Sequence, residues 1–133
     1  MNFASTSMIA QSTKAPTELD RLIQEYLEYL EVERDVSPLT VRNYAHYLRR
    51  FLQWMHSQGN DKLSEINQES VRQYRLHLSR IPAGPAAAKA GARQAIGKKT
   101  QGYHAIALRS FLKYMIRTDH PAFAPEKIDL PKG

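Results

Sequence analysis

Residues 37–55, SPLTVRNYAHYLRRFLQWM, carry the signals of a complete amphipathic helix. Ser37 is a favourable N-cap, and Pro38 at the first helical position has no N–H group that would need a partner. The apolar residues that follow recur every three or four positions and predict one buried face: Val41, Tyr44, Leu48, Phe51, Leu52 and Met55. Gly59 favours the end of the helix. We therefore expect a helix over about residues 38–58.

The opposite face of this helix is polar and basic. Its hydrogen-bond donors are Arg42, His46, Arg49 and Gln53, flanked by Asn43, Tyr47 and Arg50. Arginine forms forked hydrogen bonds to phosphate oxygens, and an asparagine or glutamine amide fits the edge of an adenine. A helix face that is merely solvated explains the same pattern of charge equally well.

Three further helices are predicted on either side of this stretch. Thr17 is an N-cap candidate for a helix over about 17–34, Asn67 for one that ends before Pro82, and the last helix begins near Lys98 and ends before Pro121. The apolar positions of the first of these are Leu19, Leu22, Ile23, Tyr26, Leu27 and Leu30, and those of the helix after Asn67 are Val71, Tyr74, Leu76 and Leu78. No window alternates at the period of a strand. We expect an all-α fold, a bundle of four main helices around one core.

The segments outside the helices divide the chain into one domain and two flanks. Residues 1–16 are rich in Ser, Thr and Gln and predict a flexible leader, and residues 81–97 combine Pro, Gly and Ala into a mobile basic loop. Residues 121–133 are punctuated by proline and predict a linker to a further domain, so the helical domain spans 17–120. A short turn favours antiparallel packing of the first two helices, whereas the long loop leaves the crossing of the last helix undetermined.

The chain has a net charge of +6 and a pI of about 9.7, which suits a polyanionic partner. The charges are sorted along the sequence, with seven acids and two bases in residues 17–35 but fourteen bases and three acids in residues 42–117. One surface should therefore be much more positive than the rest. There are no cysteines, which excludes disulfides and thiolate metal sites and fits a reducing cytoplasm. No stretch predicts a signal peptide or a membrane span.

A second basic group lies at the predicted start of the last helix, where the sequence reads KKTQGY over residues 98–103. Free backbone N–H groups and the helix dipole favour an anion at a helix N-terminus. Lys98 and Lys99 oppose that dipole, and a bound phosphate would relieve the conflict. This pattern favours a nucleic acid as the partner.

Other kinds of chemistry find little support in the sequence. Its five histidines lack the spacing of a metal site, and its acidic residues cluster on one predicted solvent face without a nucleophile nearby. A hydrolase therefore ranks last among the possible functions. We expect no metal, no cofactor and no small-molecule substrate.

Two stretches resemble a known family: LIQEYLEYLEVERDVSPLTVRNYAHYLRRFLQWM at residues 22–55 and GYHAIALRSFLKYMIRTD at residues 102–119. They are similar to the core-binding, SAM-like domain of tyrosine recombinases, the phage integrase family. The pattern S..T...Y...L..F, here from Ser37 to Phe51, is the most specific part of the likeness, and a second match is the LRSF of residues 108–111. The resemblance covers about residues 19–132.

The resemblance implies a domain that clamps one face of a recombination half-site on double-stranded DNA, beside other protomers of the same recombinase. Together with the two basic groups, it yields the following candidate DNA-binding residues: Thr40, Arg42, Asn43, His46, Arg49, Arg50, Lys98, Lys99, Thr100, Gln101 and Tyr103. In such recombinases a tyrosine and a set of basic residues in a second domain cleave the strand. We find none of that set here, so we expect no catalytic residues and no catalysis from this chain. The stretch 81–97 is also longer than the turn that is usual at this point of the family.

A second hypothesis is a helical protein-interaction module whose basic face binds an acidic partner. Charge alone does not separate it from DNA binding. A following domain with the recombinase residues favours the first hypothesis, and an unrelated one favours the second.

Overall fold

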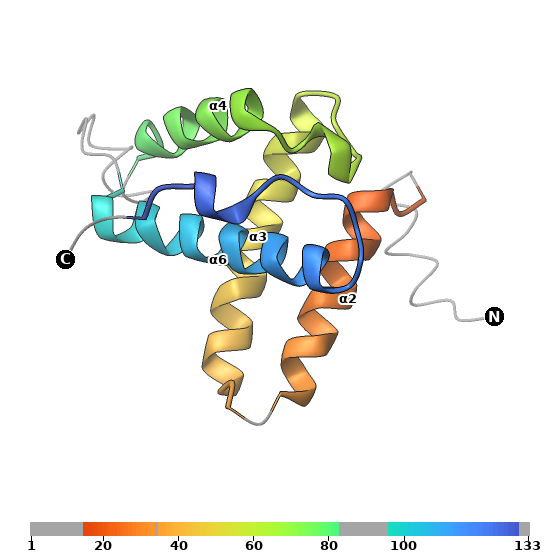
Figure 1. Cartoon of the computed structure of the whole chain (residues 1–133). Helices are drawn as coiled ribbons and strands as arrows, with labels where there is room; N and C mark the ends of the chain where they lie inside the picture. The colour runs from red at the N-terminus through yellow and green to blue at the C-terminus, as the bar shows by residue number, and fades with distance from the viewer. Residues whose placement is uncertain (1–14, 34, 83–95, 131–133) are drawn as a thin grey trace.

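The computed structural model describes residues 15–33, 35–82 and 96–130, and these residues form an all-α structure (Figure 1). Four helices appear in this part of the chain, and no strand: α2 (Glu18–Val32), α3 (Pro38–Ser57), α4 (Gln68–Ser79) and α6 (Lys98–Arg117). Two short 3₁₀ helices accompany them, η1 (Leu63–Glu65) and η2 (Pro125–Lys127). The predicted all-α fold is confirmed. Nearly all of the predicted leader and of the loop over 81–97 lies outside the described residues.

Each predicted N-cap begins its helix. The hydroxyl of Thr17 accepts the backbone N–H of Asp20, and the carboxylate of Asp20 accepts the N–H of Thr17 at 2.8 Å, so the two residues form a reciprocal capping box. Asn67 and Ser70 form a second such box at α4, and Ser37 caps α3 by accepting the N–H of Thr40. These local bonds explain why the helix starts could be read from the sequence.

Helices α2 and α3 lie side by side as an antiparallel hairpin, and α6 lies across both of them (Figure 1). The turn of the hairpin is at the end remote from α4, and it extends beyond α6. Helix α6 contacts α2, α3, α4 and η2, so it is the central element of the packing. The sequence left this crossing undetermined.

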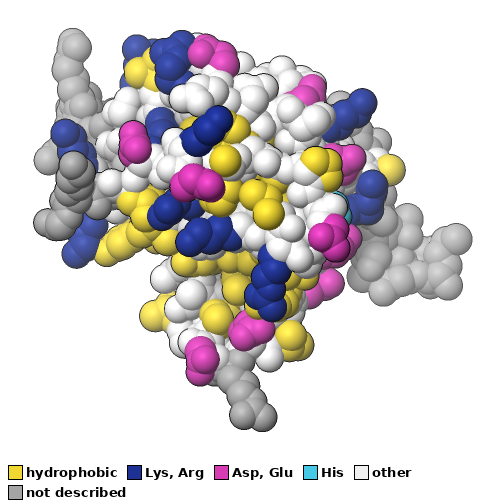
Figure 2. Space-filling model, viewed as in Figure 1, with side chains coloured by type: hydrophobic (Ala, Val, Ile, Leu, Met, Phe, Trp, Pro, Cys, Tyr) yellow, Lys and Arg dark blue, Asp and Glu magenta, His cyan; other side chains and the backbone are white. Residues whose placement is uncertain are grey.

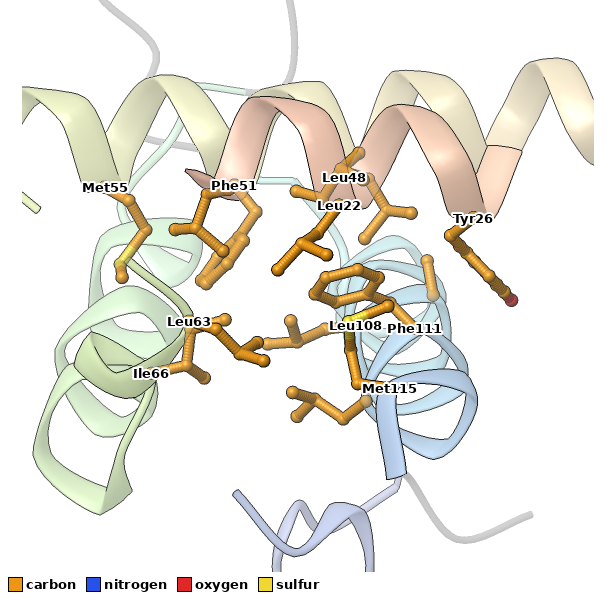
Figure 3. Close-up of a cluster of buried hydrophobic side chains, with 14 of the residues drawn as sticks. Leu22, Tyr26, Leu48, Phe51, Met55, Leu63, Ile66, Leu108, Phe111 and Met115 are labelled. Atoms are coloured by element: carbon orange, nitrogen blue, oxygen red, sulfur yellow. The ribbon is translucent and has the colours of Figure 1, made fainter. Parts of the chain in front are cut away.

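The core lies where these helices meet (Figure 3). Its side chains come from all four helices, from η1 and from the residue after it. Those labelled in Figure 3 are Leu22, Tyr26, Leu48, Phe51, Met55, Leu63, Ile66, Leu108, Phe111 and Met115. Full burial of one such side chain contributes about 1.5–3 kcal/mol. The predicted face of α3 is only partly buried at Val41, Tyr44 and Leu52. For Val41 and Tyr44, which lie in the first half of α3, the reason is that this part of the hairpin extends past α6.

One of the apolar positions of α4 lies outside the core. Leu76 in α4 is 37% exposed, whereas Val71, Tyr74 and Leu78 are buried. The three buried positions are spaced by three and four residues and share one face of the helix. Leu76 is two residues from Tyr74, which turns it roughly 200° away from that face.

The C-terminal segment packs on the domain instead of leaving it. From Pro121 to Leu130 the chain runs back along α6, and Pro125 and Ile128 are buried. Arg75 in α4 donates a hydrogen bond to the backbone carbonyl of Asp129 at 2.6 Å. This part of the predicted linker therefore belongs to the packed structure, while the connection to a further domain stays a prediction.

A candidate nucleic-acid interface on α3 and α6

The polar face of α3 forms a shallow depression. It is lined by Arg42, His46, Arg49, Arg50 and Gln53, the residues that helical spacing had grouped together. All are exposed except Arg50, which is half-buried. Three guanidinium groups, an imidazole and an amide thus surround one open hollow, and this arrangement suits an oxygen-rich, negatively charged ligand.

The start of α6 supplies the second predicted group. Gly97 is the N-cap and offers no side-chain acceptor to the first turn, while Lys98 and Lys99 are exposed. The first backbone N–H groups of the helix therefore lack a capping side chain. Gln101 donates its side-chain amide to the carbonyl of Ile96 at 2.9 Å, and so it is partly committed to the local backbone.

Aromatic and histidine rings join the two groups. The ring of Tyr47 in α3 lies 4.5 Å from that of His104 and 6.3 Å from that of Tyr103, both in α6. Arg50 is within hydrogen-bond distance of His104, with 3.2 Å between its Nη1 and the ring Nε2. We call this contact line the α3–α6 seam. It places the basic face of α3 next to the first two turns of α6.

The arginines of the α3 depression and the lysines at the start of α6 form no ion pair with an acidic residue in the described part of the chain. The ion pairs found there are Arg72 with Glu69, both in α4, and His56 with Asp20, neither of which involves the seam. On the face shown in Figure 2, by contrast, acidic side chains lie between the basic ones. The three guanidinium groups of the α3 depression thus lie close together without an ion pair, although Arg42 also borders a hollow that Glu31 lines.

Two predicted residues have a more local role. The hydroxyl of Thr40 lies 3.0 Å from that of Ser37, and its N–H donates to the same Ser37 oxygen, so Thr40 belongs to the cap of α3. Thr100 is half-buried, and its carbonyl oxygen accepts the Nδ1–H of His104 at 2.8 Å. Asn43 and Tyr103 are exposed, as a contact residue should be.

His104 is the residue of the seam that the sequence analysis missed. It is only 2% exposed, and the sequence analysis gave it no role beyond noting that the histidines lack the spacing of a metal site. Burial lowers the pKa of its ring, the hydrogen bond to Thr100 raises it, and the charge of Arg50 lowers it further. A signal was present: His104 precedes Leu108 and Phe111 by four and seven residues and so falls on the apolar face of α6.

A hollow at the start of α2 brings together a hydroxyl, a histidine and a carboxylate. It is lined in part by Thr17, Asp20 and His56. The hydroxyl oxygen of Thr17 and the carboxylate oxygen of Asp20 each lie 3.4 Å from the same atom, Nε2 of His56. A nucleophile relay needs these two groups on opposite ring nitrogens. The trio therefore supports the helix cap, and a hydrolase gains no support.

The described residues contain neither a metal site nor a membrane span. No group of three metal-ligating side chains comes together in them. None of their helices has the length and apolar character required to span a bilayer.

Comparison with known proteins identifies related sequences. Residues 23–119 match the family model of the phage integrase, N-terminal SAM-like domain. The chain is 32% identical over 101 residues to tyrosine recombinase XerC of Bacillus pumilus, and 26% identical over 118 residues to proteins of the same name from Shigella dysenteriae and Escherichia coli. These alignments cover 76% and 88% of this chain but only 29% and 35% of the relatives. The chain thus spans about a third of their length.

A solved structure shares the fold. The crystal structure of the N-terminal domain of a phage integrase/site-specific recombinase from Haloarcula marismortui aligns with a TM-score of 0.65. The alignment covers 89% of this chain and 100% of that one, at 16% sequence identity. At so low an identity the likeness concerns the arrangement of helices, and it confirms the predicted SAM-like architecture.

Proposed function

The chain belongs to the phage integrase N-terminal SAM-like domain family, and on this premise we propose that it binds duplex DNA as the core-binding domain of a tyrosine site-specific recombinase. The observation that carries the proposal is the depression lined by Arg42, Arg49 and Arg50 next to the start of α6, with no carboxylate paired to these cations in the described part of the chain. A cationic hollow without acidic partners fits a phosphate backbone.

The proposed contacts fall into two kinds. Lys98, Lys99 and the three arginines of α3 bind phosphate oxygens, which fixes the position of the domain but carries no sequence information. Asn43 and Gln53 are exposed amides on the same helix and are the side chains suited to the edge of a base. Recognition is therefore mainly electrostatic, with limited direct reading of sequence.

The rest of the recombinase completes the clamp in this proposal. The matched family model is that of the N-terminal domain, so strand cleavage and rejoining belong to a C-terminal catalytic domain. The N-terminal domain covers one face of a half-site. Other protomers of the same recombinase bind neighbouring half-sites. We place the protein in the cytoplasm, where the DNA is.

A fluorescence-anisotropy titration of the 133-residue chain against a labelled duplex tests the proposal. We expect the affinity to fall steeply as salt rises, because bound phosphates release counterions. Arg49→Glu combined with Lys99→Glu should weaken binding at least about tenfold at low salt, since two phosphate contacts become repulsive.

Arg72→Glu is the matched control for each charge reversal, because Arg72 is already paired with Glu69 on α4. It should change the affinity by less than about threefold. No binding at low salt, or equal effects of the control and of the Arg49→Glu, Lys99→Glu variant, would refute the proposal. Binding to an acidic protein but not to DNA would favour an interaction module instead.

A further inference from the structure

The bond between Arg50 and His104 crosses the seam and joins two groups that can both carry positive charge. Nη1 of Arg50 lies 3.2 Å from Nε2 of His104, and Nδ1 of the same ring lies 2.8 Å from the carbonyl oxygen of Thr100. A guanidinium group only donates hydrogen bonds, and a carbonyl oxygen only accepts them. Both bonds can therefore form only when His104 is neutral, with its proton on Nδ1.

The surroundings of His104 hold it in this state. Its ring is buried between α3 and α6, with the rings of Tyr47 at 4.5 Å and His46 at 6.2 Å between centroids. Burial is the main cause of its lowered pKa, and Arg50 and His46 lower that pKa further, so the ring is neutral near pH 7. The ring is thus a fixed acceptor inside the seam.

Arg50 connects this buried acceptor with the surface. It is half-buried, and it lines the same depression as Arg42, Arg49 and Gln53. Of its five N–H donors, the bond to His104 uses one. On the side of α4, burial raises the pKa of Tyr74 and the charge of Arg50 opposes that rise, while burial lowers the pKa of His77 and the charge of Arg50 lowers it further. A long side chain that is held at one point loses less freedom when it binds a ligand with its remaining donors.

We propose that His104 is a positioning residue, which holds the guanidinium group of Arg50 at the seam so that its free N–H groups meet a DNA phosphate. This inference rests on the proposed function. It adds a buried residue, with no contact to DNA of its own, to the determinants of binding. It also makes the contribution of Arg50 depend on the protonation of His104, because a proton on Nε2 removes the acceptor and sets two cations side by side.

A double-mutant cycle in the 133-residue chain tests the proposal, with duplex affinity as the readout. Arg50→Ala should weaken binding roughly 5- to 10-fold, and His104→Phe, which keeps a buried ring but no acceptor, roughly 3- to 10-fold. In the Arg50→Ala background, His104→Phe should change affinity less than about twofold, because its partner is gone. His104→Gln restores a carbonyl acceptor near the position of Nε2 and should recover most of the lost affinity.

The contribution of Arg50 should also depend on pH. It is measured as the ratio of the affinities of the wild-type chain and the Arg50→Ala variant at each pH, so that charge gained by other histidines affects both proteins alike. The titratable groups near His104 are Arg50, His46 and Tyr47 of α3 and Tyr103 of α6, and α4 adds Tyr74 and His77 near Arg50. The ratio should fall towards one as the pH drops through the pKa of His104, and it should stay constant in the His104→Gln background.

Nitrogen-15 NMR of the imidazole rings provides a readout that does not depend on a variant folding. The expected spectrum shows His104 neutral at pH 7 with its proton on Nδ1. A proton on Nε2 or a charged ring would overturn the proposal. So would an unchanged affinity in Arg50→Ala, an unchanged affinity in a folded His104→Phe variant, or an equal loss from His104→Phe with and without Arg50. His120→Phe controls for the exchange of a histidine for a phenylalanine outside the seam.

These outcomes separate the two proposals. If the wild-type chain does not bind duplex DNA at low salt, the proposed function itself is refuted. If it binds, and Arg49→Glu with Lys99→Glu weakens binding while His104→Phe does not, only the proposed positioning role of His104 is refuted.

Discussion

Arg109 donates a hydrogen bond from Nε to the backbone carbonyl of Pro125 at 3.0 Å, which ties the C-terminal segment to α6. Arginine is usually exposed on a helix, yet the side chain of Arg109 is half-buried, and its hydrogen bond is made within the domain. The bond lies beside the buried Pro125 and near Ile128, so a charged group anchors an apolar contact.

We expect Arg109→Ala to lower the free energy of unfolding by about 1–3 kcal/mol, because the Pro125 carbonyl loses a charge-assisted hydrogen bond and the segment loses packing. Urea denaturation followed by circular dichroism measures the change. Lys113→Ala removes an exposed base from the same helix and should stay within about 0.5 kcal/mol of the wild type. Equal stabilities of the two variants would mean that the segment does not depend on Arg109.

Tyr74 has a buried hydroxyl group without a hydrogen-bond partner in the described residues. Burial raises the pKa of this phenol well above its ordinary value, and its ring packs edge-on against Phe51 at 4.9 Å. Tyr74→Phe keeps the ring and removes the unpaired group. It should therefore leave the free energy of unfolding unchanged or raise it by about 1 kcal/mol in urea denaturation. A loss of more than about 1 kcal/mol would reveal a partner for the hydroxyl, such as a bound water molecule.

The stability of the fold should depend on pH through His104. Its pKa is lower in the folded chain than in the unfolded chain, so between these two values the unfolded chain binds more protons. The free energy of unfolding should therefore fall as the pH drops from about 7.5 to about 5.5, through the ordinary pKa of histidine. Urea denaturation at several pH values measures the slope.

His104→Phe should show a shallower slope over the same range. Part of the slope should remain in this variant, because burial also lowers the pKa of His77. Glu69 does not interfere, because its hydrogen bonds to Arg72 and Gln73 lower its pKa to about 2. A slope that is identical in wild type and variant would show that the proton uptake occurs elsewhere.

Ser37 sets the start of α3 and holds Thr40 in the cap. Its hydroxyl accepts the N–H of Thr40 at 3.1 Å, so Ser37→Ala should cost about 1 kcal/mol of stability in thermal or urea unfolding. Ser37→Asp keeps an acceptor at the N-cap and should retain the stability of the wild type. If Ser37→Ala were neutral, the start of α3 would be held by packing rather than by its cap.

The elements could be predicted because their signals are local. Ser37, Thr17 and Asn67 each bond to a backbone N–H three residues away, and such caps need no information from the rest of the chain. Leu76 is apolar but lies outside the buried face of α4, because helical spacing turns it away from Val71, Tyr74 and Leu78.

One part of the candidate site could be predicted because its signal is local, and the other part could not. Arg42, His46 and Arg49 share a face of α3 by helical spacing, which the sequence contains and the structure shows. Arg50 and His104 are separated by 54 residues, and no local pattern indicates that their side chains meet. Their hydrogen bond follows from the way α6 crosses the hairpin.

By itself, the sequence determined the four helices, the caps of α2, α3 and α4, the apolar faces and the cations of α3, because hydrogen bonds within a few residues and a 3.6-residue period set all of these. Only the tertiary structure decided that α6 lies across α2 and α3, that residues 121–130 pack back onto it, and that Arg50 reaches His104. The burial of apolar surface that drives this packing has no preferred direction. Which faces meet is therefore settled by the shape of the whole core.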